Sequence, residues 1–191
     1  MGRLLALFAC CAALSACVAT RPIPAPAPWE RRSADLQHAN TWQLDGRAAV
    51  AVGAQGWQAS LNWRQNGAAA ELHLAGPLGV GALVLRATPE GVSLNGATPS
   101  DTVLAQLQDK LGFELPLDDL RYWLLGVPKP GTEFTLTRNA QDRAQQLSQD
   151  GWTVDFDRYV PVNGDLLPTR AVLSREGVRV RIAVDHWMAP R

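Results

Sequence analysis

Cysteine is scarce in this chain and is confined to its start. The sequence has 191 residues and only 3 cysteines, Cys10, Cys11 and Cys17. The sequence after Cys17 therefore has no thiol with which to form a disulfide. Any domain folded from that part must be stabilised by burial and packing of apolar side chains.

The sequence also lacks a net charge. Its 18 basic residues are balanced by 18 acidic ones. Nucleic-acid-binding domains usually concentrate basic residues on one face. The balanced composition therefore predicts that nucleic acid is not a partner.

Motifs typical of catalysis and metal binding are missing as well. Neither a Gly-x-Ser-x-Gly nucleophile elbow nor a phosphate-binding loop occurs in the sequence. His38, His73 and His186 are far apart, with no ligand-like His-x-x-x-His spacing. Asp118 and Asp119 do not form a catalytic pair, because adjacent residues of a helix do not face each other. We expect no catalytic residue, no metal site and no cofactor.

No apolar run is long enough to span a membrane. The stretch from Leu4 to Leu14 falls well short of the about 20 residues that a bilayer requires. It follows a basic residue, Arg3, and precedes two small residues and Cys17, which is the layout of a signal peptide. Leu14-Ser15-Ala16-Cys17 resembles the lipobox of bacterial lipoproteins.

The lipobox resemblance implies a covalent modification. Residues 1–16 would be a lipoprotein signal peptide, and Cys17 would carry an N-acyl diacylglyceryl group that holds the protein on a membrane. Val18 follows the cysteine, and in enterobacteria the absence of aspartate there implies export to the outer membrane. The alternative is an ordinary secretory signal cleaved after Ala16, with Cys17 an unmodified thiol.

Proline marks the next segment as a tether. Between Arg21 and Pro28 every second residue is proline, which favours an extended polyproline II conformation. At about 3.1 Å per residue, such a segment holds a domain roughly 30 Å from the bilayer. We expect residues 17–28 to be the lipidated tether and residues 29–191 to be one folded domain.

Most of residues 29–191 shows the two-residue alternation of β-strands. Leu44, Ala48 and Val50 alternate with polar residues such as Arg47, and Asn66-Gly67 is typical of a hairpin turn. Strands are predicted from Thr41, around Trp57 to Trp63, Ala70 to Leu74 and Leu83 to Leu85, and at 91–95, 132–138, 144–149, 152–159, 169–175 and 178–187.

Helices are predicted at the start of the domain and in the middle of the strands. Residues 29–39 form a short helix, and a second runs from Ser100 or Asp101 to Leu111, before Gly112. A third, from Pro116 to Leu125, has apolar residues on almost all of its faces, which indicates that other parts of the protein pack against more than one side of it. A single sheet of nine or ten strands must curl to bury one face. We therefore predict an open half-barrel closed by a helical lid.

Several motifs in this order are similar to those of the LolB family of outer-membrane lipoprotein receptors. They cover nearly all of the sequence after the tether and comprise Trp42-x-x-x-Gly46-Arg47, Gly76-Pro77-Leu78-Gly79, Leu115-Pro116-Leu117-x-x-Leu120-x-x-Trp123-x-x-Gly126, Gln149-x-Gly151-Trp152 and Leu167-Pro168. The resemblance implies a mainly β fold, a half-barrel of about eleven antiparallel strands with a lid over a hydrophobic cavity. It implies a monomer, lipid-anchored in the outer membrane and facing the periplasm, that accepts lipoproteins from a LolA-like carrier and inserts them into the inner leaflet.

The resemblance also suggests roles for particular residues. The loop Gly76, Pro77, Leu78 and Gly79 would touch the membrane through Leu78, although a lone exposed leucine is ordinarily without function. Arg47 is a candidate for a hydrogen bond to the lid, or simply a solvated arginine. We predict that the cavity that holds the acyl chains of the cargo is lined by Leu61, Trp63, Leu72, Leu74, Leu83, Leu85, Leu120, Trp123 and Leu124.

Three other interpretations remain open at this stage. The tryptophans would be plain core residues in a structural envelope lipoprotein. The same fold would also suit a carrier of another lipid. A lipid-modifying enzyme would need a nucleophile and a base, for which the sequence shows no candidates.

Overall fold

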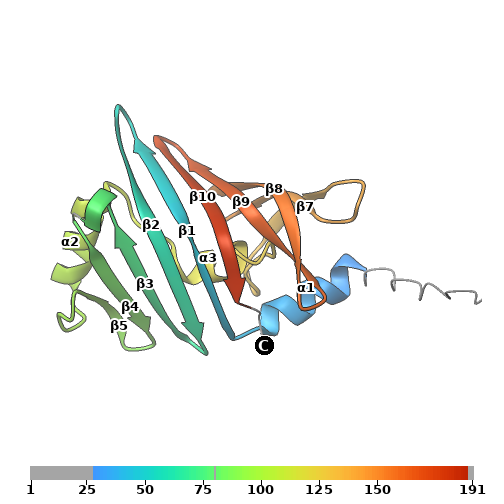
Figure 1. Ribbon diagram of the computed structural model, residues 1–191, viewed down its shortest axis with the longest axis horizontal. Helices are drawn as coiled ribbons and strands as arrows, with labels where there is room; N and C mark the ends of the chain where they lie inside the picture. The colour runs from blue at the N-terminus through green and yellow to red at the C-terminus, as the bar shows by residue number, and fades with distance from the viewer. Residues whose placement is uncertain (1–27, 80, 189–191) are drawn as a thin grey trace, which may run out of the picture.

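The computed structural model describes residues 28–79 and 81–188, so the expected signal peptide and nearly all of the tether lie outside the described residues. Ten antiparallel strands form one open sheet, in the order β5-β4-β3-β2-β1-β10-β9-β8-β7-β6 (Figure 1). Ten strands among the described residues agree with the alternation of the sequence and are one fewer than the eleven that the family resemblance implied. The strands are β1 (Thr41–Val52), β2 (Gln55–Asn66), β3 (Ala69–Ala75), β4 (Leu83–Thr88), β5 (Gly91–Leu94), β6 (Phe134–Arg138), β7 (Ala144–Gln149), β8 (Trp152–Val162), β9 (Asp165–Arg175) and β10 (Val178–Met188).

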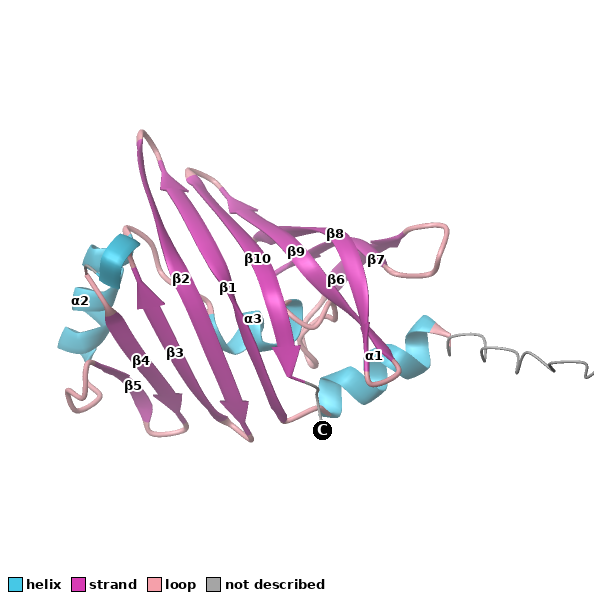
Figure 2. Cartoon of the chain, viewed as in Figure 1, coloured by secondary structure: helices cyan, strands magenta, loops and turns pink. Residues whose placement is uncertain are grey.

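Alternation decides which face of the sheet is buried. Along β1, Leu44, Ala48 and Val50 are buried, whereas Arg47 and Ala51, which point to the opposite side, are exposed. The buried residues turn toward the helices, and in the view of Figure 2 helix α3 (Leu117–Trp123) lies behind the sheet. We call the side covered by α3 the inner face and the opposite side the outer face.

An aromatic cluster fills one part of the inner face. The rings of Trp42 and Trp63 stack with centroids 5.6 Å apart, and Trp187 meets Trp42 edge-on at 5.7 Å. The indole Nε1 of Trp63 donates a hydrogen bond of 3.0 Å to Gln65 Oε1. These rings belong to the packed core, to which such pairs add about 0.5–1.5 kcal/mol beyond burial.

Gly46 lies where strands β1 and β10 come unusually close. The register of the two strands shifts between Asp45 and Gly46. A Cβ atom on Gly46 would lie only 2.3 Å from the carbonyl oxygen of Ala183. Only glycine therefore fits without moving the backbone of β10.

Gly46→Ala should lower the free energy of unfolding by about 1–3 kcal/mol, because the added methyl group forces β1 and β10 apart. Urea unfolding of the purified domain measures the change. Gly56→Ala is the matched control on β2, since its Cβ would lie 3.1 Å from the Val50 carbonyl oxygen and needs only a small adjustment. Equal losses in the two variants would show that the close approach at Gly46 is unimportant.

Helices α2 and α3 follow β5 and are separated by a short linker. Helix α2 (Asp101–Leu111) begins after Ser100, whose Oγ accepts a hydrogen bond from the Val103 amide, and ends at Gly112. This agrees with the predicted bounds. Helix α3 (Leu117–Trp123) is shorter than the predicted 116–125, because the chain leaves the helix in a tight turn in which the Val127 amide bonds to the Tyr122 carbonyl.

Helix α1 (Trp29–His38) precedes β1 and begins beside the turn between β6 and β7 (Figure 1). The backbone amide of Trp29 donates a 2.8 Å hydrogen bond to Asp142 Oδ2 in the turn between β6 and β7. Gln37 Nε2 donates to the carbonyl of Pro128, in the segment that follows α3. Helix α1 is thus attached both to the sheet and to the segment after α3. Within residues 28–79 and 81–188, no helix has the length and apolarity to cross a membrane.

Candidate functional site

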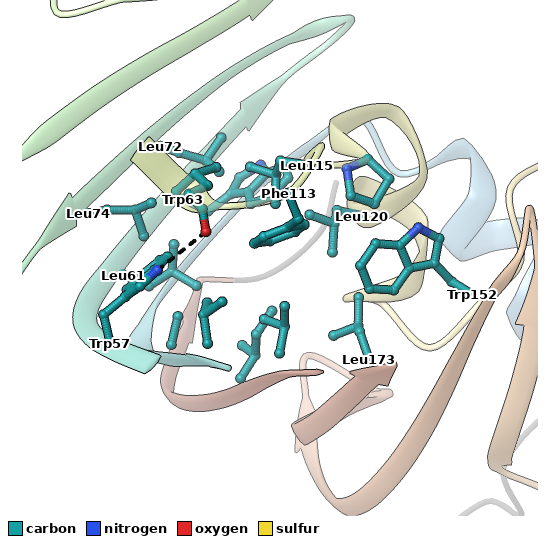
Figure 3. Close-up of a pocket in the computed structure, with 16 residues that line it drawn as sticks. Trp57, Leu61, Trp63, Leu72, Leu74, Phe113, Leu115, Leu120, Trp152 and Leu173 are labelled. Atoms are coloured by element: carbon teal, nitrogen blue, oxygen red, sulfur yellow. Dashed lines mark hydrogen bonds between the residues drawn. The ribbon is translucent and has the colours of Figure 1, made fainter. Parts of the chain in front are cut away.

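An apolar cavity lies between the inner face of the sheet and the α2–α3 region. All of its lining residues are apolar, and they come from six strands, both helices and the linker between the helices (Figure 3). Strand alternation explains the sheet side of the cavity, since every second residue of β1, β2, β3 and β10 points inward. The lining consists of Ala48, Val50, Trp57, Leu61, Trp63, Leu72, Leu74, Leu111, Phe113, Leu115, Pro116, Leu120, Trp152, Leu173, Val180 and Ile182.

The cavity is small in this structure. Its volume is about 40 Å³, whereas pockets that hold drug-sized ligands have about 300–1,000 Å³. In Figure 3, Phe113 and Leu120 reach toward the sheet from the linker and from α3. A ligand as long as an acyl chain therefore enters only if the linker and α3 move outward.

Gln149, at the end of β7, holds α3 and the segment that follows it in place through hydrogen bonds. Its Oε1 accepts hydrogen bonds from Trp123 Nε1 and from the Lys129 amide, each 2.9 Å long. Its Nε2 donates to the Lys129 carbonyl at 2.8 Å and to Thr132 Oγ1 at 2.6 Å. Gln149 is buried, so these four bonds are made where water does not compete.

An ion pair stabilises the same region. Lys129 Nζ lies 2.7 Å from Asp119 Oδ1, and the Asp119 carboxylate is buried at the start of α3. The hydrogen bond from this carboxylate, opposed by partial burial, raises the pKa of Lys129 above its ordinary value. Lys129 therefore keeps its charge. The start of α3 is attached to Lys129 and its end, through Trp123, to Gln149 of β7.

The structure places five of the nine predicted cavity residues around this cavity and four elsewhere. Leu61, Trp63, Leu72, Leu74 and Leu120 line it. Placing Trp123 and Leu124 in the cavity is wrong, because α3 turns Trp123 toward Gln149 and Trp152, and both residues are buried in the core.

The prediction is also wrong for two residues of β4. Leu85 is completely buried and Leu83 is half-buried against the core. Strand β4 lies beyond β3, next to β5, and α2 packs on β5. These leucines therefore belong to the packing beneath α2 and do not face the cavity under α3.

Arg47 does not couple to the lid. Its side chain is 70% exposed on the outer face and its Nη2 lies 2.9 Å from Asp185 Oδ1. Strand alternation puts Arg47 on the side opposite its neighbour Ala48, which lines the cavity. Of the two interpretations of Arg47, its position in this structure fits the solvated surface arginine.

Sequence reasoning missed Phe113 and the role of Gln149. Phe113 lies in the linker between two predicted helices, where its burial has no periodic signal. Its apolar neighbours Leu115 and Pro116 are the only hint, since exposed loops rarely hold three apolar residues so close together. Gln149 was visible only as part of a motif, because a buried glutamine has no signature in hydrophobic periodicity.

The loop after β3 carries the most exposed apolar side chain of the described residues. Leu78 is fully exposed at the tip of a short 3₁₀ turn, η1 (Pro77–Gly79), that a hydrogen bond from the Gly79 amide to the Gly76 carbonyl closes. Its backbone is left-handed, with φ of 58°, a conformation that costs a non-glycine residue roughly 1–2 kcal/mol. A strained, fully exposed leucine is a candidate for contact with an apolar partner.

An open antiparallel sheet with helices over one apolar face defines a LolA-like half-barrel. The structure matches a crystal structure of a LolA superfamily protein from Nitrosomonas europaea with a TM-score of 0.55 over 84% of this chain and 93% of that one. Identity is 8%, so this comparison concerns the fold alone.

The sequence identifies the family. The model of the family described as outer membrane lipoprotein LolB matches residues 40–187. Outer-membrane lipoprotein LolB of Ectopseudomonas mendocina is 31% identical over 96% of this chain and 92% of its own length, and that of Pseudomonas savastanoi pv. phaseolicola is 32% identical over the same shares. The chain belongs to the LolB family of outer-membrane lipoproteins, as the sequence motifs predicted.

Proposed function

We propose that this protein accepts lipoproteins from a LolA-like periplasmic carrier and inserts them into the outer membrane. The observation that carries the proposal is the wholly apolar cavity enclosed by the sheet, α2, the linker and α3. Membership of the LolB family supports the same role. The protein itself would act as a monomer, held on the inner leaflet by acyl groups on Cys17.

The chemistry of the cargo explains why a cavity is needed. Exposing an acyl chain to water costs about 0.8 kcal/mol per methylene group, so a chain of about a dozen groups costs roughly 10 kcal/mol. A lipoprotein therefore needs apolar cover at each step between membranes. Binding and release through an apolar cavity require no catalytic residue, and the direction of transfer follows from increasing affinity along carrier, receptor and bilayer.

Because the cavity is small, the linker and α3, which together form the lid, must move to admit the cargo. Acyl chains would displace Phe113 and Leu120 from the space that they occupy, with Gln149 acting as the fixed point of the moving segment. The apolar surface uncovered by this opening is then covered again by the chains, which offsets the cost of opening.

The direct test is binding of an acylated peptide. The purified mature protein should bind it at least 100-fold more tightly than the same peptide without acyl groups, as fluorescence or calorimetry would show. Equal affinity for both would exclude the cavity as the binding site. Competition by a free phospholipid at the same affinity would instead favour a general lipid carrier.

A pair of variants on β1 locates the site. Ala48→Leu adds apolar bulk to the cavity wall and should weaken acylated-peptide binding about 10-fold or more, because a cavity this small does not accommodate extra methylene groups. Ala51→Leu makes the same change at an exposed position of the same strand and should leave binding unchanged. A loss of binding in both variants, or in neither, would contradict the location.

A further inference from the structure

A second concavity lies on the outer face, opposite the apolar cavity. It is an open groove lined by the side chains of three arginines, by small residues of the central strands and by the 76–79 loop with Leu78. Its lining includes Arg47, Arg170 and Arg181 but no aspartate or glutamate. We call this feature the arginine groove.

The strand register explains how the groove forms. Across the sheet, Ala75, Ser60, Arg47, Ala183 and Arg170 lie side by side on strands β3, β2, β1, β10 and β9. Strands are about 4.8 Å apart, so Arg47 lies roughly 10 Å from the strand whose end leads into the Leu78 loop. The loop and the first arginine therefore belong to one continuous surface.

The neighbouring row completes the pattern. There Gln58, Ala49, Arg181 and Val172 lie side by side on β2, β1, β10 and β9. Each arginine thus has an alanine beside it in its own row, Ala183 next to Arg47 and Ala49 next to Arg181. Short side chains between long ones leave the floor of the groove open and allow the guanidinium groups to form its sides.

The cationic charge of the groove is only partly neutralised within the protein. Arg181 has no ion pair in the described part of the chain. Arg47 pairs with Asp185 at 2.9 Å and Arg170 pairs with Asp157 at 3.5 Å, and all four of these side chains are at least 43% exposed. Exposed pairs contribute little, about 0–1 kcal/mol, so all three guanidinium groups are available to an anionic ligand.

We infer that the arginine groove binds the headgroups of anionic phospholipids, with Leu78 entering the same bilayer beside them. Guanidinium groups form bidentate hydrogen bonds with phosphate oxygens. The apolar side chain of Leu78 at the edge of the groove can enter a bilayer, whereas a soluble anion offers it no apolar contact. The outer face would then lie against the membrane and the cavity would remain accessible from the inner side. This inference extends the proposed function, since it takes Leu78 to face the bilayer.

The test is binding of the mature protein, with Cys17→Ala to remove the site of acylation, to vesicles in the absence of cargo. Vesicles of phosphatidylethanolamine that also contain phosphatidylglycerol should bind it about 10-fold more tightly than vesicles without it. Arg170→Gln combined with Arg181→Gln should remove most of this difference, a loss of up to about 10-fold, given the contribution of each arginine near an anionic surface.

The matched control removes the same charge from the same face. Arg64 on β2 and Arg86 on β4 flank Glu71 in another row, and Arg64 lies about 13 Å along β2 from Ser60, beyond the screening length at physiological salt. Arg64→Gln combined with Arg86→Gln should retain the preference for anionic vesicles. Urea unfolding of both double variants verifies that they fold.

Three outcomes would overturn the inference. Equal losses in the two double variants would show a general effect of net charge. Equal binding to both vesicle types would show that the groove does not recognise anionic lipid, and displacement by millimolar inorganic phosphate would show a site for free anions. Transfer of a lipoprotein from the carrier into phosphatidylethanolamine vesicles tests the proposed function separately, because that assay contains no anionic headgroup.

Discussion

Leu78→Glu should leave the protein folded and able to bind acylated peptide, but should reduce lipoprotein insertion into liposomes by about 10- to 100-fold. Burying one leucine in a bilayer is worth roughly 1.5–3 kcal/mol, and each 1.4 kcal/mol is a factor of ten. Leu78 is fully exposed and makes no core contact, so its loss has no cost for folding. The reduction follows from losing the apolar contact and introducing a charge that the bilayer excludes.

The measurement is transfer of a labelled lipoprotein from carrier to liposomes, in parallel with binding of acylated peptide. Leu104→Glu is the matched control, because Leu104, on α2, is the other strongly exposed leucine of residues 28–79 and 81–188. It should retain normal insertion. Normal insertion by Leu78→Glu would remove the loop from the mechanism, and equal defects in both variants would point to overall charge.

Gln149→Leu should lower the free energy of unfolding by about 3–5 kcal/mol and weaken the attachment of the lid. The change leaves Trp123 Nε1, the Lys129 amide and the Lys129 carbonyl without their partner, and each unpaired buried group costs about 1–3 kcal/mol. Relaxation of the segment toward water limits the total. Because the lost bonds hold α3, acylated peptide should also bind and dissociate faster than in the unmodified protein.

Urea unfolding measures the stability, and stopped-flow kinetics measure how fast acylated peptide binds and dissociates. Gln146→Leu is the control, since Gln146 lies on the same strand, is exposed and bonds to the Asp155 side chain. It should change stability by less than about 1 kcal/mol. A Gln149→Leu protein with unchanged stability would show that this hydrogen-bond network does not hold the lid.

Much of the fold could be predicted from local patterns. Alternation in β1 and β2 gave the buried face, because a strand exposes successive side chains to opposite sides of a sheet. Asn66-Gly67 gave the turn between β2 and β3, since the left-handed backbone at Gly67 favours glycine. The motif order further identified the LolB family, which the comparisons confirm.

The arrangement of the site was less predictable. Leu83 and Leu85 have the same alternation as Leu72 and Leu74, yet only the β3 pair faces the cavity. Along a single strand nothing distinguishes them, because the difference depends on which helix covers each strand. Trp123 likewise follows the helical pattern of Leu120 but is turned toward a glutamine from a strand 26 residues away.

The sequence by itself determined the order of the strands along the chain, the inward and outward faces, the exposed Leu78 and the family, because these depend on local periodicity and short motifs. Only the tertiary structure decided that the cavity is small, that Gln149 holds the lid and that three arginines from separate strands share a groove with Leu78. These features depend on contacts between residues far apart in the chain, and no local pattern specifies which distant side chains meet.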